Sequence, residues 1–190
     1  VPGPSGLPAA IADLNGDGND DLVFIRGPHL GARLGHELVI RLGNGDGTYR
    51  RGTTIAMSRR VLEVQAARLS SGDGVDLAVL DRRPRTGMRT LRVYRNDGDL
   101  RFTLTTDQVR PETLSLIGGI AFDGAEGRES LLVRDGAFIR AMKFTDAGAI
   151  GTSPVVDGVD KFLAIGDLDQ DGREDLIDRV VNNQGDVEIR

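Results

Sequence analysis

The amino-acid sequence predicts an all-β protein of about four repeats, each a unit of four antiparallel strands. A short acidic, glycine-containing motif recurs at intervals of 55, 54 and 45 residues, beginning at positions 13, 68, 122 and 167. A period of this length is typical of repeat architectures. Between the motifs, apolar runs are short, rich in β-branched residues and separated by Gly, Asp and Asn. We find no segment with the periodicity of a long helix.

The strands expected in each repeat follow its motif in chain order. They include residues 22–25, 38–40, 77–80, 91–93, 131–133 and 187–189. Turns are expected at 43–47, 96–99 and 182–186, where Gly, Asn and Asp tolerate positive φ. The repeats then cover approximately residues 11–55, 61–107, 114–156 and 160–190. The last repeat is incomplete and lacks an outer strand unless residues 1–10 or a further part of the chain supply it.

Composition narrows the classes of function. Of the 190 residues, 28% are charged and 39% are hydrophobic, which is typical of a soluble globular chain. No apolar run reaches the roughly 20 residues of a membrane-spanning helix, so we expect no direct membrane insertion. The chain has no cysteine, which excludes disulfides and thiolate metal sites. A net charge of −5 argues against nucleic-acid partners.

No sequence motif supports enzyme activity. The chain contains no nucleophile elbow, phosphate-binding loop or dinucleotide-binding fingerprint. We expect His29 and His36 in a solvated loop, and neither belongs to a zinc-binding helix motif. We therefore expect a non-catalytic protein.

The first motif has the ligand spacing of a calcium loop. Oxygen-bearing side chains occupy positions 1, 3, 5 and 9 of nine residues, namely Asp13, Asn15, Asp17 and Asp21. Gly18 stands at position 6, where the chain must turn sharply, and the backbone carbonyl of Asn19 at position 7 is a natural further ligand. Carboxylate and amide oxygens at this spacing favour Ca²⁺ over Mg²⁺. A solvated acidic turn is the alternative.

The last motif repeats this pattern, and the two middle motifs do not. The second full copy consists of Asp167, Asp169, Asp171 and Asp175, with the backbone carbonyl of Arg173 at position 7. In the middle motifs the ligand positions hold other residues, namely Arg68, Ser70 and Gly72, and Phe122, Gly124 and Ser130. We therefore expect two calcium ions rather than four. Because crowded carboxylates repel one another, binding should stabilise the fold.

An EF-hand or dockerin loop opens with the same residues and is the second interpretation. An EF-hand needs Glu at position 12 and a helix on each side. Position 12 is Phe24 in the first copy and Asp178 in the second. Residues 22–25 have the pattern of a strand, and only 176–181 leaves room for a helix. The EF-hand is therefore the weaker interpretation.

The first motif and the segment 42–49, Leu-Gly-Asn-Gly-Asp-Gly-Thr-Tyr, together resemble the FG-GAP/VCBS repeat of integrin-α-type β-propellers. The resemblance covers the whole chain and is specific in the first and fourth repeats. It implies that each repeat is a four-stranded blade with its calcium loop between the first and second strands. It also implies that the ligands named above hold two calcium ions. Such propellers usually have about seven blades, although propellers of four blades exist. This chain would then be a four-bladed propeller, part of a longer propeller, or part of an oligomer that completes the ring.

The resemblance implies a calcium-stabilised module for extracellular protein recognition or scaffolding, secreted or on the cell surface. Millimolar extracellular calcium suits loops of this kind. A carbohydrate-binding propeller is a second interpretation, disfavoured because the chain has no Trp and only 2 Tyr. An accessory propeller of a larger secreted enzyme or toxin is a third, and a purely structural role is a fourth.

Six arginines in residues 82–95 could form a basic edge on the second repeat. Tyr94 is the only aromatic residue among them, so stacking on single-stranded nucleic acid is poorly supported. An acidic protein or a glycan is the partner that such an edge would favour.

Overall fold

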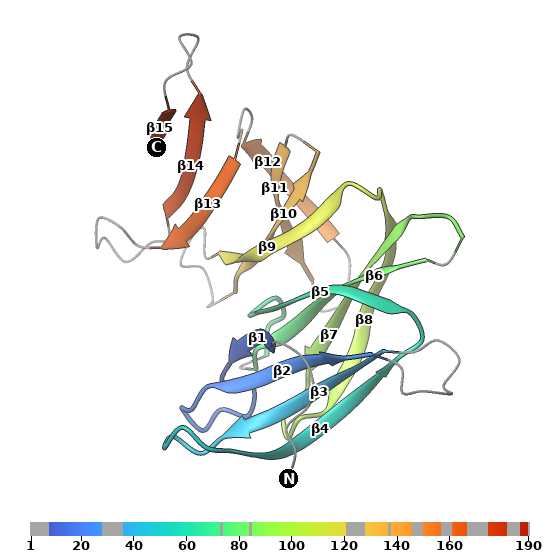
Figure 1. The fold of residues 1–190 in the computed structure, drawn as a ribbon, viewed down its shortest axis with the longest axis vertical. Coiled ribbons are helices and arrows are strands. Elements are labelled where there is room, and N and C mark those ends of the chain that lie inside the picture. Colours follow the sequence, from blue (N-terminus) through green and yellow to red (C-terminus); the bar gives the residue numbers. More distant parts are fainter. Residues whose placement is uncertain are drawn as a thin grey trace.

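The computed structural model describes residues 8–27, 36–72, 74–83, 85–120, 128–136, 138–145, 150–156, 161–166, 175–181 and 187–189 (Figure 1). These residues form fifteen strands and no helix, which confirms the predicted all-β fold. All the strand pairs are antiparallel, and the strands are grouped in four separate sheets. Within the described part of the chain, no sheet closes on itself and no ring of sheets is closed.

Each sheet consists of strands that follow one another in the chain. The first contains β1 (Pro8–Ala12), β2 (Asp21–Arg26), β3 (His36–Gly43) and β4 (Tyr49–Met57). The second contains β5 (Arg60–Ala67), β6 (Asp76–Arg82), β7 (Arg89–Asn96) and β8 (Phe102–Arg110). The third contains β9 (Leu114–Ile120), β10 (Ser130–Asp135), β11 (Phe138–Phe144) and β12 (Ile150–Val156). The fourth contains β13 (Lys161–Gly166), β14 (Asp175–Val181) and β15 (Val187–Ile189).

The same register opens all four sheets. The first residue of the second strand pairs with the last residue of the first strand, as in Ala12–Asp21, Ala67–Asp76, Ile120–Ser130 and Gly166–Asp175. Because side chains alternate between the two faces of a strand, an equal register places equivalent residues on equivalent faces. Position 9 of each motif therefore has the same place in each sheet.

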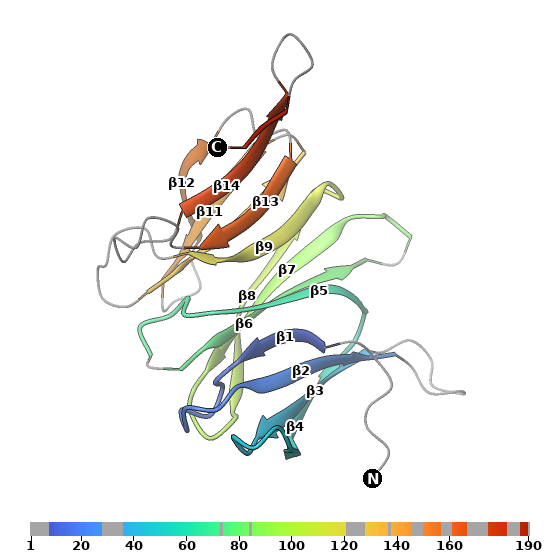
Figure 2. The same ribbon diagram turned by 60° about the vertical axis from the view of Figure 1, so that its left-hand side comes forward.

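The first three sheets pack face to face, with their first strands next to one another. β5 contacts both β1 and β9, and Figure 2 shows β1, β5, β9 and β13 following one another along the molecule. One apolar core fills the space between the first and second sheets and includes Val23, Ile40 and Val79. Another, between the second and third sheets, includes Leu80 and Leu131. Burying each such side chain contributes about 1.5–3 kcal/mol.

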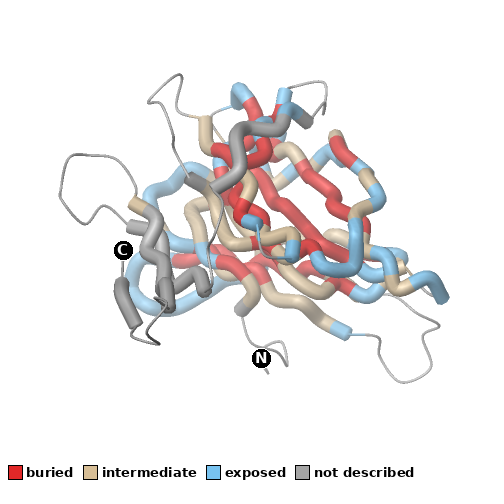
Figure 3. Tube along the Cα trace, turned by 90° about the horizontal axis from the view of Figure 1, so that it is seen from above, coloured by how far each residue is buried: buried red, intermediate tan, exposed pale blue. Residues whose placement is uncertain are grey.

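Burial follows the strands and excludes the turns. Figure 3 shows the buried positions along the strands and many of the exposed ones at the turns. In β6, six consecutive residues are buried, because both faces of the second sheet are covered. In β4 and β8, at the outer edge of their sheets, most residues are exposed or half-buried. The sheets are therefore buried most completely where neighbouring sheets cover them.

Three expectations from the sequence need correction. Residues 8–12 belong to the first sheet and pair with β2, so they do not complete the last sheet. His36 begins strand β3 rather than lying in a loop, and burial lowers the pKa of its imidazole. Both full motifs lead into strands, β2 and β14, so the EF-hand or dockerin interpretation is wrong. Within the described residues, no helix could span a membrane.

Candidate metal-binding loop

The first loop, residues 13–20, connects β1 to β2 and is shaped by the carboxylate of Asp13. Its Oδ1 accepts hydrogen bonds from the backbone N–H groups of Gly16 (2.7 Å) and Asp17 (3.2 Å), and its Oδ2 accepts one from Gly18 (2.8 Å). Gly18 has φ of +83°, a backbone conformation that L side chains rarely adopt. The carboxylate at position 1 of the motif therefore fixes the conformation of the loop through hydrogen bonds to the backbone of positions 4, 5 and 6.

Asn15 and Asp17 lie together within this loop. The Asp17 N–H donates to Asn15 Oδ1 at 2.9 Å, and Asn15 Nδ2 donates to Asp17 Oδ2 at 2.9 Å. The backbone N–H of Asn19 donates to Asp17 Oδ1, and Arg50 Nη2 lies 3.5 Å from Asp17 Oδ2. These contacts, led by the hydrogen bond from the Asn15 side chain, lower the pKa of the exposed Asp17 carboxyl. Asp17 is therefore held in its ionised form.

Asp21, at position 9, is buried at the start of β2. Its Oδ2 accepts the N–H of Leu14 at 2.9 Å, and its Oδ1 accepts the N–H of Gly43 at 2.9 Å. Burial raises the pKa of this carboxyl, although both hydrogen bonds oppose the rise and the charges of Asp17 and Asp13 add to it. Asp21 therefore ties the first loop to the end of β3.

Asp76 has the same role in the second sheet, where the other ligand positions are lost. Its Oδ2 accepts the N–H groups of Leu69 (3.1 Å) and Ser70 (2.8 Å), and its Oδ1 accepts that of Asn96 (2.8 Å). Both Asp21 and Asp76 are 0% exposed. We call these two residues the clamp aspartates. The sequence predicted that position 9 binds metal, and it did not predict that this aspartate accepts backbone N–H groups. One signal was present: the second motif keeps Asp76 although its other ligand positions hold Arg68, Ser70 and Gly72.

The loops of neighbouring sheets are joined by hydrogen bonds along one edge of the molecule. Asn96 Nδ2 donates to the carbonyl of Leu14 at 2.8 Å, which links the second sheet to the first loop. The N–H of Glu129 donates to the carbonyl of Arg68 at 2.6 Å, and the N–H of Arg68 donates to Glu129 Oε2 at 2.9 Å. These hydrogen bonds therefore link the first loop to the end of β7, and the second loop to the residue that precedes β10.

The donor chemistry of the first loop suits calcium. Asp13, Asn15 and Asp17 offer carboxylate and amide oxygens. Of these, Asp13 Oδ2 and Asn15 Oδ1 each accept a single N–H group, so each keeps a lone pair for a cation. Among the residues that the structure describes, however, no three Asp, Glu or His side chains are gathered as a metal-binding group. The predicted ligands are thus close in sequence and linked by hydrogen bonds, and the calcium site itself stays a prediction.

The second predicted site lies largely outside the described residues. This applies to Asp167, Asp169, Asp171 and Arg173. Asp175 is described as the first residue of β14 and pairs with Gly166, in the register that Asp21 has in the first sheet. The position-9 residue of the fourth motif therefore has the same backbone place as the clamp aspartates.

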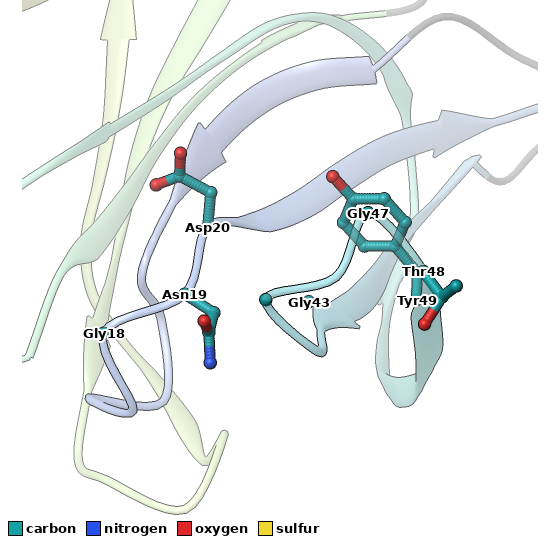
Figure 4. A pocket seen from close by; sticks show the side chains of 8 residues that line it. Gly18, Asn19, Asp20, Gly43, Gly47, Thr48 and Tyr49 are labelled. Atoms are coloured by element: carbon teal, nitrogen blue, oxygen red, sulfur yellow. The ribbon is translucent and has the colours of Figure 1, made fainter.

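A hollow of about 270 Å³ lies between the first loop and the turn that joins β3 to β4. Figure 4 shows Asn19 and Asp20 on one side of it and Thr48 and Tyr49 on the other. Glycines form the rest of its wall, and a Cβ atom at Gly43 would clash with the backbone carbonyl of Asp20. The close approach of the two segments therefore depends on glycine, and no sequence pattern indicated this hollow.

Three of the six arginines in the expected basic edge form ion pairs. Arg92 is buried, with its Nη1 2.7 Å from Asp81 Oδ2, so this part of the expectation is wrong. Arg95 Nε lies 2.6 Å from Asp97 Oδ1, and Arg89 Nη1 lies 3.6 Å from a Glu63 oxygen. Sequence spacing could not reveal these pairs, because most of them join different strands.

No protein-family model matches this chain, and no curated protein matches it significantly. The resemblance to FG-GAP/VCBS repeats therefore rests on the motif residues of the sequence.

Proposed function

We propose that this chain is part of a calcium-stabilised β-propeller of the FG-GAP/VCBS type. It acts as a non-catalytic module for protein recognition or scaffolding, secreted or on the cell surface. The observation that carries the proposal is that four separate antiparallel sheets open in the same register, with position 9 of a motif as the first residue of the second strand in each. Blades of a propeller repeat in this manner.

Calcium is the cofactor that the motif residues favour. One ion is held by Asp13, Asn15, Asp17, Asp21 and the carbonyl of Asn19, and the other by the corresponding residues 167–175. The ions order loops whose like charges repel one another in their absence. The row of hydrogen bonds then carries this order to the neighbouring sheets.

The partner is a protein bound by the loops at one edge of the sheets or by the rim. In the proposed arrangement a further blade, from a longer chain or from another copy, covers the free face of the first sheet. The exposure of Ile11 supports this step. Ile11 lies between Ala10 and Ala12, which pack into the first core, so it projects to the opposite face, and it is 58% exposed.

Native mass spectrometry with and without EDTA, paired with thermal melts, tests the proposal. We expect two calcium ions per chain and a melting temperature that falls in EDTA. The mass also reports whether chains assemble. The exchange Asp99→Asn is a matched control, because the Asp99 side chain is 91% exposed and lies outside the motifs. A chain that binds no calcium and melts unchanged in EDTA would overturn the calcium assignment.

A further inference from the structure

The sequence Asn-Gly-Asp-Gly occurs twice in the chain, as residues 15–18 of the first loop and as residues 44–47 of the turn that joins β3 to β4. An asparagine that is followed by glycine is prone to deamidation, because glycine has no side chain to hinder attack by its backbone nitrogen. The two copies have the same reactive atoms. Any difference in their reactivity therefore comes from the structure around them.

Deamidation needs no reagent other than water. The backbone nitrogen of the glycine loses its proton and attacks the side-chain Cγ of the asparagine, and the amide nitrogen leaves as ammonia with the proton that the glycine lost. Water then opens the cyclic imide at either of its carbonyls. The product is aspartate, or isoaspartate when the main chain continues through the former side chain.

The copy in the first loop is held in an unreactive form. The N–H of Gly16 donates to Asp13 Oδ1 at 2.7 Å. The amide of Asn15 is held at both ends, because its Oδ1 accepts the Asp17 N–H and its Nδ2 donates to Asp17 Oδ2, each at 2.9 Å. Removing the proton of Gly16 would place a second negative charge beside Asp13, which is unfavourable. Attack on Asn15 therefore requires the loss of three hydrogen bonds.

The copy in the turn is open at the same atoms. Asn44 and Gly45 are both exposed. Among the described residues, no acceptor is hydrogen-bonded to the Gly45 N–H, and no donor is hydrogen-bonded to Asn44 Oδ1. The Asn44 side chain makes one hydrogen bond, from Nδ2 to Thr48 Oγ1 at 2.9 Å, and Thr48 is itself exposed. The attacking nitrogen and the amide that it attacks are therefore both accessible.

Modification of Asn44 loosens the contact between the turn and the first loop, which Figure 4 shows opposite one another. The product has no Nδ2 donor for Thr48. It also adds a negative charge beside Asp46, whose pKa is lowered by hydrogen bonds from the side chain and backbone of Thr48. Isoaspartate lengthens the main chain by a methylene group as well. The turn has little room to shift, since a Cβ atom at Gly45 would lie 2.5 Å from Asn19 Oδ1.

We propose that Asn44 is a site of spontaneous deamidation, and that the identical sequence at Asn15 is protected by the hydrogen bonds of the first loop. With time the turn acquires an aspartate or an isoaspartate, while the loop keeps its amide. This inference goes beyond the recognition function proposed above, because it assigns a covalent modification and needs neither calcium nor a partner.

Peptide mapping by mass spectrometry tests the site. The folded 190-residue chain is incubated in EDTA at mildly alkaline pH, and trypsin then places the two segments in different peptides, 1–26 and 42–50. Asn44 should deamidate at least about tenfold faster than Asn15, a difference that three hydrogen bonds can supply. In the chain unfolded by urea, the two rates should be similar. Equal rates in the folded chain would overturn the proposal, as would a folded chain in which Asn44 stays unmodified when the unfolded chain has fully reacted.

Variants assign the reaction to the named atoms. Asn44→Gln keeps an amide but forms the larger cyclic imide far more slowly, so the mass gain of peptide 42–50 should disappear. Asp13→Ala removes the acceptor of the Gly16 N–H, so Asn15 should react faster. Asp99→Asn is the matched control and should change neither rate, because its side chain is 91% exposed and lies outside both segments.

A thermal melt of each variant verifies its fold. A mass gain of peptide 42–50 that persists in Asn44→Gln would overturn the proposal. A rate at Asn15 that Asp13→Ala leaves unchanged would reject the protection assigned to Asp13.

Discussion

The first and second loops keep the same clamp and differ in everything else that the calcium motif needs. Asp21 and Asp76 are both fully buried, and each accepts N–H groups from position 2 of its own motif and from the last residue of the third strand of its sheet. Positions 1 and 3 are Asp13 and Asn15 in the first loop but Arg68 and Ser70 in the second. The aspartate at position 9 therefore stabilises the sheet in both repeats, and the residues at the other positions decide whether a cation can bind.

The largest expected effect is the loss of a clamp. Asp76→Ala leaves the buried N–H groups of Ser70 and Asn96 unpaired, while that of Leu69 keeps the carbonyl of Ala67 as acceptor. We therefore expect unfolding in urea to show a loss of about 3 kcal/mol. The loss should be the same with calcium and with EDTA. Glu112→Ala, at an exposed position, should stay within about 0.5 kcal/mol of the parent chain. A loss for Asp76→Ala as small as that of the control would contradict the clamp.

Calcium should give the next largest effect, and only the first loop of the pair should respond. At a free concentration of 100 Kd, each ion stabilises the chain by about 2.7 kcal/mol, which EDTA removes. Asp17→Ala should reduce the bound calcium from two ions to one in native mass spectra. If Asp17→Ala keeps both ions, Asp17 is not a ligand. If Asp99→Asn also loses one, the effect is not specific to the motif.

A smaller effect should come from the turn at position 6. Gly18→Ala should cost about 1–2 kcal/mol, because Gly18 has φ of +83° and a side chain there is strained. Gly27→Ala is the control, since both positions have open space for a Cβ atom and Gly27 lacks positive φ. Thermal melts of the two variants check the difference. Equal melting temperatures would contradict the explanation that the positive φ of Gly18 makes the substitution costly.

The smallest effect is a difference in pH dependence within the first loop, measured in EDTA. Asp21 has a folded-state pKa above the ordinary 3.8, so the folded state binds more protons just above pH 3.8 and stability falls as the pH rises there. Asp17 has a lowered pKa, so its contribution is present above pH 3.8 and is lost as the pH falls below it. In urea unfolding, Asp21→Asn and Asp17→Asn should therefore change the slope of the unfolding free energy against pH in opposite directions. Slopes of the same sign would contradict the assignment.

The strands could be predicted from the sequence because their signals are local. Runs such as residues 77–80 combine β-branched and apolar residues between turn formers, and β6 covers them. The first loop was equally readable from its spacing. The clamp was not, since Asp76 meets Asn96 twenty residues away, and only the fold brings the two together.

The ion pairs and the hollow could not be predicted from the sequence either, because both depend on which strands pair and in which register. Arg92 pairs with Asp81 across β7 and β6, so its fate cannot be decided from the arginine run in which it stands. Tyr49 lines the hollow only because the turn after β3 brings it close to the first loop. Local sequence patterns thus predict the strands. Contacts between residues on facing segments can be predicted only when the pairing of the strands is known.

The hydrogen bonds from Asn96 to Leu14 and from Glu129 to Arg68 have a further consequence for how the molecule comes apart. Each of the first three sheets is fastened to the next, so these sheets behave as a one-dimensional chain of coupled units. Loosening one end weakens the adjacent unit first and more distant units later. Hydrogen exchange should therefore spread inward from a damaged end sheet in steps, one sheet at a time.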